Sequence, residues 1–129
     1  GGCDLSRAGK PFLAVNPDFN CPVENGFIPD CGSMARLITA STGAVPEFFG
    51  KPSRHALDYM LKRINCKPSE LAVVGDRLYT DIALGKNAGV QTALVLSGET
   101  RREDLAGSEY VPDMVFEDLL DLGSKIFSD

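Results

Sequence analysis

Residues 71–82 read LAVVGDRLYTDI, an apolar run that closes on a glycine and is followed by two acidic residues. We expect Leu71–Val74 to form a strand covered on both faces, because such strands read as continuous hydrophobic runs. Gly75 permits a sharp turn, and Thr80 can cap a following helix. Ligands of open α/β sheets bind beyond the carboxyl ends of the strands. The stretch therefore predicts a strand, a turn and a helix, with its two acidic residues at the strand end, where ligand-binding sites form.

The same alternation of strand and helix extends from Pro46 to the end of the chain. Strands are expected at Glu47–Phe49, Leu71–Val74, Gln91–Leu96 and Met114–Phe116. Helices are expected at Ser53–Ile64, Thr80–Ala88, Arg101–Ala106 and Leu119–Phe127. In the first of these helices, Ala56, Tyr59, Met60 and Ile64 share one apolar face. Because each helix follows a strand, the pattern favours an α/β fold with a parallel sheet.

The region before Pro46 has a different texture. A strand is expected at Phe12–Val15 and a helix at Ser33–Ser41, separated by an irregular stretch, Asn16–Gly32, that holds three prolines. A structureless connection of this length is unusual in a compact domain. We therefore expect this stretch to be functional or to lack part of its structural context.

Composition limits the classes of function. The 129 residues correspond to about one domain, and 43% hydrophobic residues allow a buried core. The charge of −5 and the scattered basic residues provide no cationic surface for nucleic acid. No apolar run reaches the roughly 20 residues of a membrane span, and no signal peptide is recognisable. We expect a soluble, cytoplasmic protein that binds neither nucleic acid nor membranes.

Cysteine usage argues against a zinc site. The chain has one histidine, and its four cysteines are far apart: Cys3, Cys21, Cys31 and Cys66. Zinc sites need clustered cysteine and histidine ligands. Four reduced thiols in a cytosolic protein is the expectation.

Two acids and a lysine are the candidates for chemistry. Asp76 and Asp81 can face one hard cation through oxygen ligands, with Asp76 binding it directly and Asp81 behind. Lys51 precedes Pro52 at an expected strand end, where an ammonium can neutralise a phosphate or a carboxylate nucleophile. Taken singly, these residues are better explained as an acid-rich turn with a helix cap and as a solvated loop lysine. Their occurrence on successive strand ends favours a common site.

The ordered set of motifs resembles the haloacid dehalogenase (HAD) superfamily, in particular its NagD-like phosphatases. The residues that carry the resemblance are Gly50-Lys51-Pro52, Val74–Ile82 and Leu94–Thr100. Upstream, Phe12–Asp18, Cys21-Pro22, Gly26 and Gly32-Ser33 resemble the end of the large α/β cap of that subfamily, and the tail Val111–Phe116 also agrees. The resemblance thus covers nearly the whole chain.

The resemblance implies a fold and a set of roles. The fold is the C-terminal half of a Rossmann-like parallel sheet flanked by helices, preceded by the final part of an α/β cap. Residues 1–46 would belong to the cap and residues 47–129 to the core. Lys51 would be the lysine that holds the nucleophile and the phosphoryl group, and Asp76 and Asp81 the magnesium motif. The loop that selects the substrate's leaving group in relatives would correspond to Asp18, Phe19, Asn20 and Cys21, for which a plain surface loop is the alternative.

The nucleophile motif of the resembled family is not found in these residues. That family uses an Asp-x-Asp motif whose first aspartate attacks phosphorus and whose second acts as general acid and base. No two aspartates of this sequence are separated by a single residue. The 129 residues therefore look like the C-terminal portion of a phosphatase. We expect them to be inactive alone and to bind magnesium weakly, since one direct carboxylate ligand remains.

The leading hypothesis is the C-terminal portion of a magnesium-dependent phosphatase of small phosphomonoesters, such as sugar or nucleotide phosphates, acting through an aspartyl-phosphate. Its partners would be a small phosphorylated metabolite and either the missing N-terminal half or further copies of the chain, because an exposed strand edge and apolar helix faces are expected. The alternative is a noncatalytic phosphate- or metal-binding module. A receiver-type flavodoxin-like module is disfavoured. It needs an acidic pair after its first strand and a lysine after its phosphoacceptor strand, whereas Lys51 here precedes Asp76.

Overall fold

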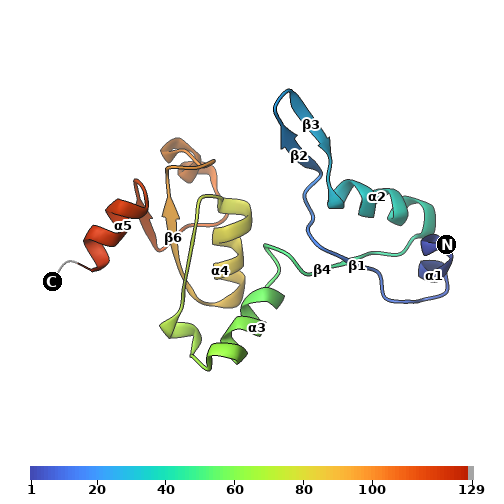
Figure 1. Ribbon diagram of the computed structural model, residues 1–129, viewed down its shortest axis with the longest axis horizontal. Coiled ribbons are helices and arrows are strands. Elements are labelled where there is room, and N and C mark those ends of the chain that lie inside the picture. The colour runs from blue at the N-terminus through green and yellow to red at the C-terminus, as the bar shows by residue number, and fades with distance from the viewer. Residues whose placement is uncertain (128–129) are drawn as a thin grey trace. The chain divides into compact units, whose positions relative to one another are not determined.

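The computed structural model describes residues 1–127 and forms two compact units that divide after Gly50 (Figure 1). The sequence places the boundary earlier, after Pro46. The difference arises because the strand at Glu47–Phe48 pairs in parallel with Leu13–Ala14 and so belongs to the first unit. None of the helices in the described residues is long and apolar enough to span a membrane.

The first unit holds two small sheets and two helices. In chain order its elements are α1 (Gly2–Arg7), β1 (Leu13–Ala14), β2 (Asn20–Val23), β3 (Gly26–Pro29), α2 (Cys31–Thr42) and β4 (Glu47–Phe48). Asp30 caps α2, because its side chain accepts a hydrogen bond from the backbone N–H of Cys31 at 2.7 Å. Gly43 ends the helix in the left-handed conformation, at φ 75°. The helix therefore starts two residues before the Ser33 expected from sequence.

The expectation that Asn16–Gly32 is irregular is largely wrong. Strands β2 and β3 form an antiparallel hairpin in which Asn20 lies opposite Pro29 and Val23 opposite Gly26. Figure 1 shows the hairpin leading directly into α2. The two residues between the strands are Glu24 and Asn25, and Gly26 at the start of β3 adopts φ 130°, a backbone conformation that glycine tolerates. The prolines are tolerated because a two-stranded sheet consists of edge strands.

The second unit is built on a three-stranded parallel sheet. Its elements are α3 (His55–Ile64), η1 (Pro68–Glu70), β5 (Ala72–Gly75), η2 (Leu78–Ile82), α4 (Ala83–Ala88), β6 (Gln91–Val95), η3 (Arg102–Gly107), β7 (Met114–Phe116) and α5 (Leu119–Ile126). The strand order is β5-β6-β7. Ala72 pairs with Gln91, and Ala93 with Met114. The α/β fold class with a parallel sheet flanked by helices is confirmed.

The core of this unit lies against the central strand β6. Residues 92–95 are buried, and Leu94 packs with Leu78 and Ile82, which are also buried. A second cluster joins Leu57 of α3 to Leu84 of α4. The helices η2 and α4, which follow Asp76 in the chain, are therefore packed against the sheet.

Two expectations about burial are wrong. Strand β5 is covered on one face only: Val73 packs against the cluster around Leu57, whereas Val74 is 42% exposed. Successive side chains point to opposite faces of a strand, and in the described residues β5 pairs with β6 alone. In α3 the face that packs contains Leu57, which is 1% exposed, so Tyr59 and Met60 on the expected apolar face are exposed.

Candidate functional site

The candidate site lies at the carboxyl ends of β5 and β6. Asp76 directly follows β5, and residues 97–100 follow β6. Because β5 and β6 are parallel neighbours, both loops emerge at the same edge of the sheet. Lys51, the first residue of the second unit, reaches the same place through its contact with Asp81.

Lys51 and Asp81 form a close ion pair. The distance from Lys51 Nζ to Asp81 Oδ1 is 2.5 Å, and the other carboxylate oxygen accepts the backbone N–H of Arg77 at 3.2 Å. The Asp81 side chain is 9% exposed, whereas that of Lys51 is 52% exposed. A buried carboxylate thus holds a lysine whose other side is open to solvent.

Gly75 makes this arrangement possible. A Cβ atom at position 75 would collide with Cβ and Cγ of Asp81 and would lie 2.5 Å from its Oδ2. The glycine is therefore needed for the close approach of the Asp81 side chain to the end of β5. The sequence suggests a sharp turn instead, but Gly75 has no positive φ.

The expected capping role of Thr80 is wrong. Thr80 lies inside η2, a helix of the π type whose N-cap is Arg77, and it is 3% exposed. Its hydroxyl has no hydrogen-bond partner among the described residues. The wider π turn carries Asp81 back toward Gly75, because the N–H groups of both Asp81 and Ile82 donate to the carbonyl of Arg77.

Asp76 is held by the loop that follows β6. Its Oδ2 accepts the backbone N–H of Glu99 at 2.8 Å, and its carbonyl accepts that of Thr100 at 3.1 Å. Gly98 lies so close to the Asp76 carboxylate that a Cβ atom there would overlap it. No other hydrogen bond reaches this carboxylate from the residues described here, so Oδ1 is available to a ligand.

A third group of side chains at this edge was not predicted from sequence. The Glu99 carboxylate pairs with Arg77 Nε at 2.7 Å and accepts a hydrogen bond from the Tyr79 hydroxyl at 3.0 Å. These contacts join the loop after β5 to the loop after β6. The motif that carries the family resemblance contains Glu99, but only the pairing of β5 with β6 brings it beside Asp76.

The two predicted metal ligands are not equivalent. Asp76 offers a free carboxylate oxygen, a hard donor of the kind magnesium prefers. Both oxygens of Asp81 already accept hydrogen bonds, one of them from a lysine. No group of three or more His, Cys, Asp or Glu side chains that could hold a metal ion occurs within residues 1–127. Of these two acids, only Asp76 has a carboxylate oxygen without a hydrogen bond among residues 1–127, so Asp76 fits a direct magnesium ligand and Asp81 does not.

The candidate substrate loop lies in the first unit, fastened to α2. The carbonyl of Asp18 accepts the N–H of Gly32 at 2.8 Å, and that of Phe19 accepts the Ser33 hydroxyl at 2.6 Å. Phe19 is 57% exposed, and Asn20 and Cys21 begin β2. The loop has a defined conformation that presents an aromatic side chain.

A second ionic cluster lies at the opposite end of the same sheet. Asp113 Oδ1 pairs with Lys86 Nζ at 2.5 Å, and Oδ2 accepts both the N–H and the hydroxyl of Thr92 at 2.8 Å. The hydrogen bond from Lys86, followed by those from Thr92, lowers the pKa of Asp113 to about 2. Asp113, which directly precedes β7, is thus joined to Thr92 of β6 and to Lys86 of α4.

Comparisons with known proteins agree on one family. A family model described as HAD-hydrolase-like matches residues 48–122. An acid sugar phosphatase of Staphylococcus epidermidis is 39% identical over 113 residues, which are 88% of this chain and 44% of that protein.

Two solved structures extend the match. The 4-nitrophenylphosphatase of Thermotoga maritima has a TM-score of 0.86 and 46% identity, covering 95% of this chain and 47% of that one. The glycerol phosphate phosphatase of Mycobacterium tuberculosis, solved in complex with magnesium, has a TM-score of 0.86 and 32% identity, covering 94% and 37%. The chain spans about half the length of the relatives it matches, and the shared part is their C-terminal half.

Proposed function

Because the chain belongs to the HAD-hydrolase-like family, we propose that it supplies the lysine and a magnesium ligand of a phosphatase that hydrolyses small phosphomonoesters. Sugar and nucleotide phosphates are the substrate class. The similar proteins support this class, since they include an acid sugar phosphatase and a 5'-nucleotidase. The observation that carries the proposal is the pairing of half-exposed Lys51 with buried Asp81.

Lys51 is the residue that neutralises the phosphoryl group. Asp81 fixes its ammonium from one side, and because the lysine is 52% exposed, its remaining N–H donors can reach a phosphate oxygen. A positioned cation lowers the energy of a phosphoryl-transfer transition state, in which negative charge spreads over the oxygens. Asp81 is thus a positioning residue, and its part in the metal site is indirect.

Asp76 is the carboxylate that binds magnesium. The free Oδ1 makes it the one direct ligand from this part of the chain, so magnesium binding by residues 1–129 alone is weak. Magnesium supplies positive charge that stabilises the phosphoryl group during transfer. The N–H of Glu99 orients the Asp76 carboxylate by occupying its other oxygen.

The two units divide the work. The first, which includes residues 1–46, is the end of the cap, and its loop Asp18–Cys21 selects the leaving group of the substrate. The second, within residues 47–129, is part of the core and carries Lys51 and Asp76. The fixed backbone of the loop and the exposed ring of Phe19 support this division.

The nucleophile has to come from outside these 129 residues. In our proposal the first aspartate of an Asp-x-Asp motif attacks phosphorus and forms an aspartyl-phosphate, and water then hydrolyses it. The second aspartate acts as general acid and base, and it donates a proton to the leaving group. No pair of aspartates in this sequence has that spacing, so residues 1–129 alone have no turnover.

The test is a fusion of the N-terminal half of the 46% identical phosphatase to Gly1 of this chain. We expect magnesium-dependent hydrolysis of 4-nitrophenyl phosphate by the fusion and none by residues 1–129 at the intact mass of 13.8 kDa. Lys51→Met and Asp76→Asn should each lower kcat by about 100-fold or more. Lys86→Met is the matched control, because Lys86 also pairs with a carboxylate at 2.5 Å but at the other end of the sheet.

Each outcome of this test is informative. Turnover by residues 1–129 alone would disprove the need for an Asp-x-Asp motif. A folded, active fusion that is unaffected by Lys51→Met and Asp76→Asn would disprove their roles. A folded fusion that binds inorganic phosphate without turnover would point to the noncatalytic binding module instead.

A further inference from the structure

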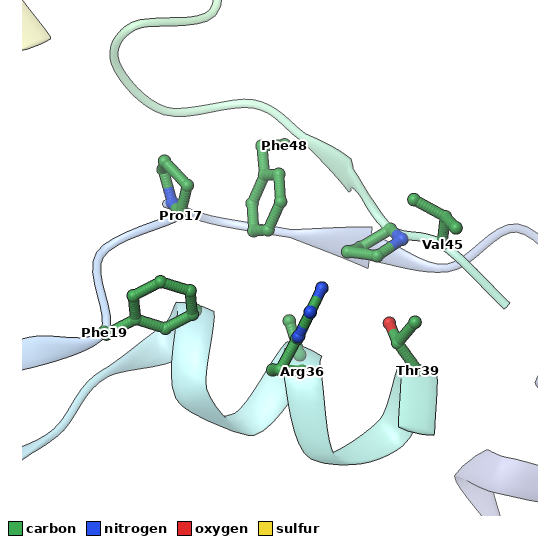
Figure 2. Close-up of a pocket in the computed structure, with 9 residues that line it drawn as sticks. Pro17, Phe19, Arg36, Thr39, Val45 and Phe48 are labelled. Carbon is green, nitrogen blue, oxygen red and sulfur yellow. The ribbon is translucent and has the colours of Figure 1, made fainter. Parts of the chain in front are cut away.

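The first unit contains a pocket between α2 and the β1–β4 sheet, which we call the α2 pocket. Its volume is about 190 Å³, and the residues that line it are Pro17, Phe19, Gly32, Ala35, Arg36, Thr39, Val45, Pro46 and Phe48. Most of these side chains are apolar. Figure 2 shows that the Phe48 ring enters the pocket from the strand side, while Arg36 and Thr39 rise into it from α2.

Arg36 is the one charged side chain that lines this pocket. No ion pair or hydrogen bond of its guanidinium is found among residues 1–127. The other arginine of the first unit, Arg7, donates to Asp4 at 3.3 Å and to the carbonyl of Ser41 at 3.1 Å. The chain carries 18 acidic residues against 13 basic ones, so the unpaired Arg36 does not reflect a shortage of carboxylates.

A cation beside apolar walls selects a particular kind of ligand. The planar guanidinium matches a carboxylate, which it can bind through two parallel hydrogen bonds. The Thr39 hydroxyl lies on the same helix, one turn further on, and provides another donor. The pocket volume exceeds the roughly 150 Å³ of an apolar cavity that takes up benzene. The apolar walls can therefore hold an apolar group of the size of a ring, and Arg36 with Thr39 can bind one negative charge.

We propose that the α2 pocket is a binding site for a small apolar monocarboxylate, with benzoate as the representative probe. The carboxylate binds Arg36 and Thr39, and the apolar body packs against Phe48 and Val45. Pro17 and Phe19 flank Asp18 and also line the pocket, so a bound ligand contacts the loop Asp18–Cys21, whose backbone is held by α2. The proposal uses residues of the first unit alone and does not depend on the proposed phosphatase function.

The test follows backbone amide signals of the isotope-labelled 129-residue chain by nuclear magnetic resonance during titration with benzoate. We expect saturable shifts at Gly32, Ala35 and Phe48 with a Kd on the order of 1 mM. Benzamide, which has the same shape without the charge, and acetate, which has the charge without the ring, should each bind at least tenfold more weakly.

Variants distinguish a built site from a simple hollow. Arg36→Gln should weaken benzoate binding about tenfold and leave benzamide binding unchanged. Arg36 is exposed, so this variant keeps the fold, which unchanged amide shifts elsewhere in the first unit will verify. Lys10→Gln is the matched control, because it removes a positive charge from the same unit outside the α2 pocket.

Three results would overturn the proposal. They are equal binding of benzoate and benzamide, equal loss of affinity in Arg36→Gln and Lys10→Gln, and the absence of saturable shifts at the pocket amides. The first would show an apolar hollow without a carboxylate site. The second would show attraction by overall charge, and the third would show that the pocket does not take up this class of ligand.

Discussion

The two ends of the β5–β6–β7 sheet both carry an aspartate that pairs with a lysine at 2.5 Å, yet the hydrogen bonds around the two pairs differ. At the amino end, the Asp113 carboxylate accepts hydrogen bonds from Lys86 and twice from Thr92. At the carboxyl end, Asp81 binds Lys51, while the Asp76 carboxylate accepts one hydrogen bond from the described residues, through Oδ2.

The difference lies in what each cluster leaves unsatisfied. Around Asp113 the contacts connect one secondary-structure element to another, as a structural tie does. At the carboxyl end, the half-exposed Lys51 ammonium and Oδ1 of Asp76, which accepts no hydrogen bond from the described residues, remain available to a ligand. Unused donors and acceptors that are already held in place by hydrogen bonds can bind a ligand without first reorganising. This is the physical reason for placing the site at that end.

The largest expected effect is that of a methyl group at Gly75. Gly75→Ala should lower the free energy of unfolding by about 2 kcal/mol, because the new Cβ collides with the buried Asp81 side chain. Urea unfolding followed by circular dichroism measures the loss. The variant would break the carboxyl-end cluster and leave the Asp113 cluster intact.

The control for that variant is Gly123→Ala in α5. A Cβ atom at Gly123 meets nothing within 4 Å, so the change should raise stability by about 0.5–1 kcal/mol through helix propensity. Equal stability of Gly75→Ala and the wild-type protein would show that Asp81 does not lie against β5.

The second effect is the loss of the amino-end tie. Asp113→Asn should lower stability at pH 7 by about 1 kcal/mol, a value that allows for solvent screening of this partly exposed group. The folded pKa of Asp113 is lowered to about 2 from its ordinary 3.8. Its contribution is therefore complete above about pH 4 and is lost as the pH falls toward 2.

Urea unfolding of wild-type protein and Asp113→Asn at pH 7 and pH 3 tests this sign. The gap between them should shrink at the lower pH. A gap that grows on acidification would mean that Asp113 is not held in its charged form by Lys86 and Thr92.

The sequence predicts the strands of the second unit well, because they depend on local patterns. The strand expected at Met114–Phe116 is found there, and the one expected at Gln91–Leu96 ends one residue earlier. Both are runs of apolar residues, which the central part of a parallel sheet requires. The place of Asp76 after a strand followed from the same local reading.

Contacts between distant residues could not be predicted in this way. Glu99 is 23 residues from Asp76 and binds it only because β5 and β6 are neighbours in register. Asp113 and Thr92 are 21 residues apart. The hairpin of the first unit is a different case, since its turn at Glu24-Asn25 and the glycine that follows are adjacent in sequence, and the prolines in the stretch concealed them.

A third prediction compares the two lysines directly. Lys51→Met should cost about 1 kcal/mol of stability and Lys86→Met about half of that. The costs differ because each substitution leaves a carboxylate without its lysine, and water solvates Asp113, which is 43% exposed, better than Asp81, which is 9% exposed. Thermal unfolding at low and at high salt measures both, and salt should reduce the cost for Lys86→Met more. Equal costs would show that Asp81 is as well solvated as Asp113.

The smallest effect concerns the side-chain link between the two site loops. Tyr79→Phe removes the hydrogen bond to Glu99 and, because Tyr79 is half exposed, should change stability by less than about 0.5 kcal/mol. Its effect should instead be local, since Glu99 also carries the N–H that holds Asp76. Hydrogen exchange of the Glu99 amide should become faster, while that of Thr92 at the other end of the sheet should stay unchanged. Faster exchange at both amides would mean that Tyr79 supports the sheet as a whole, and the two ends would then not be independent.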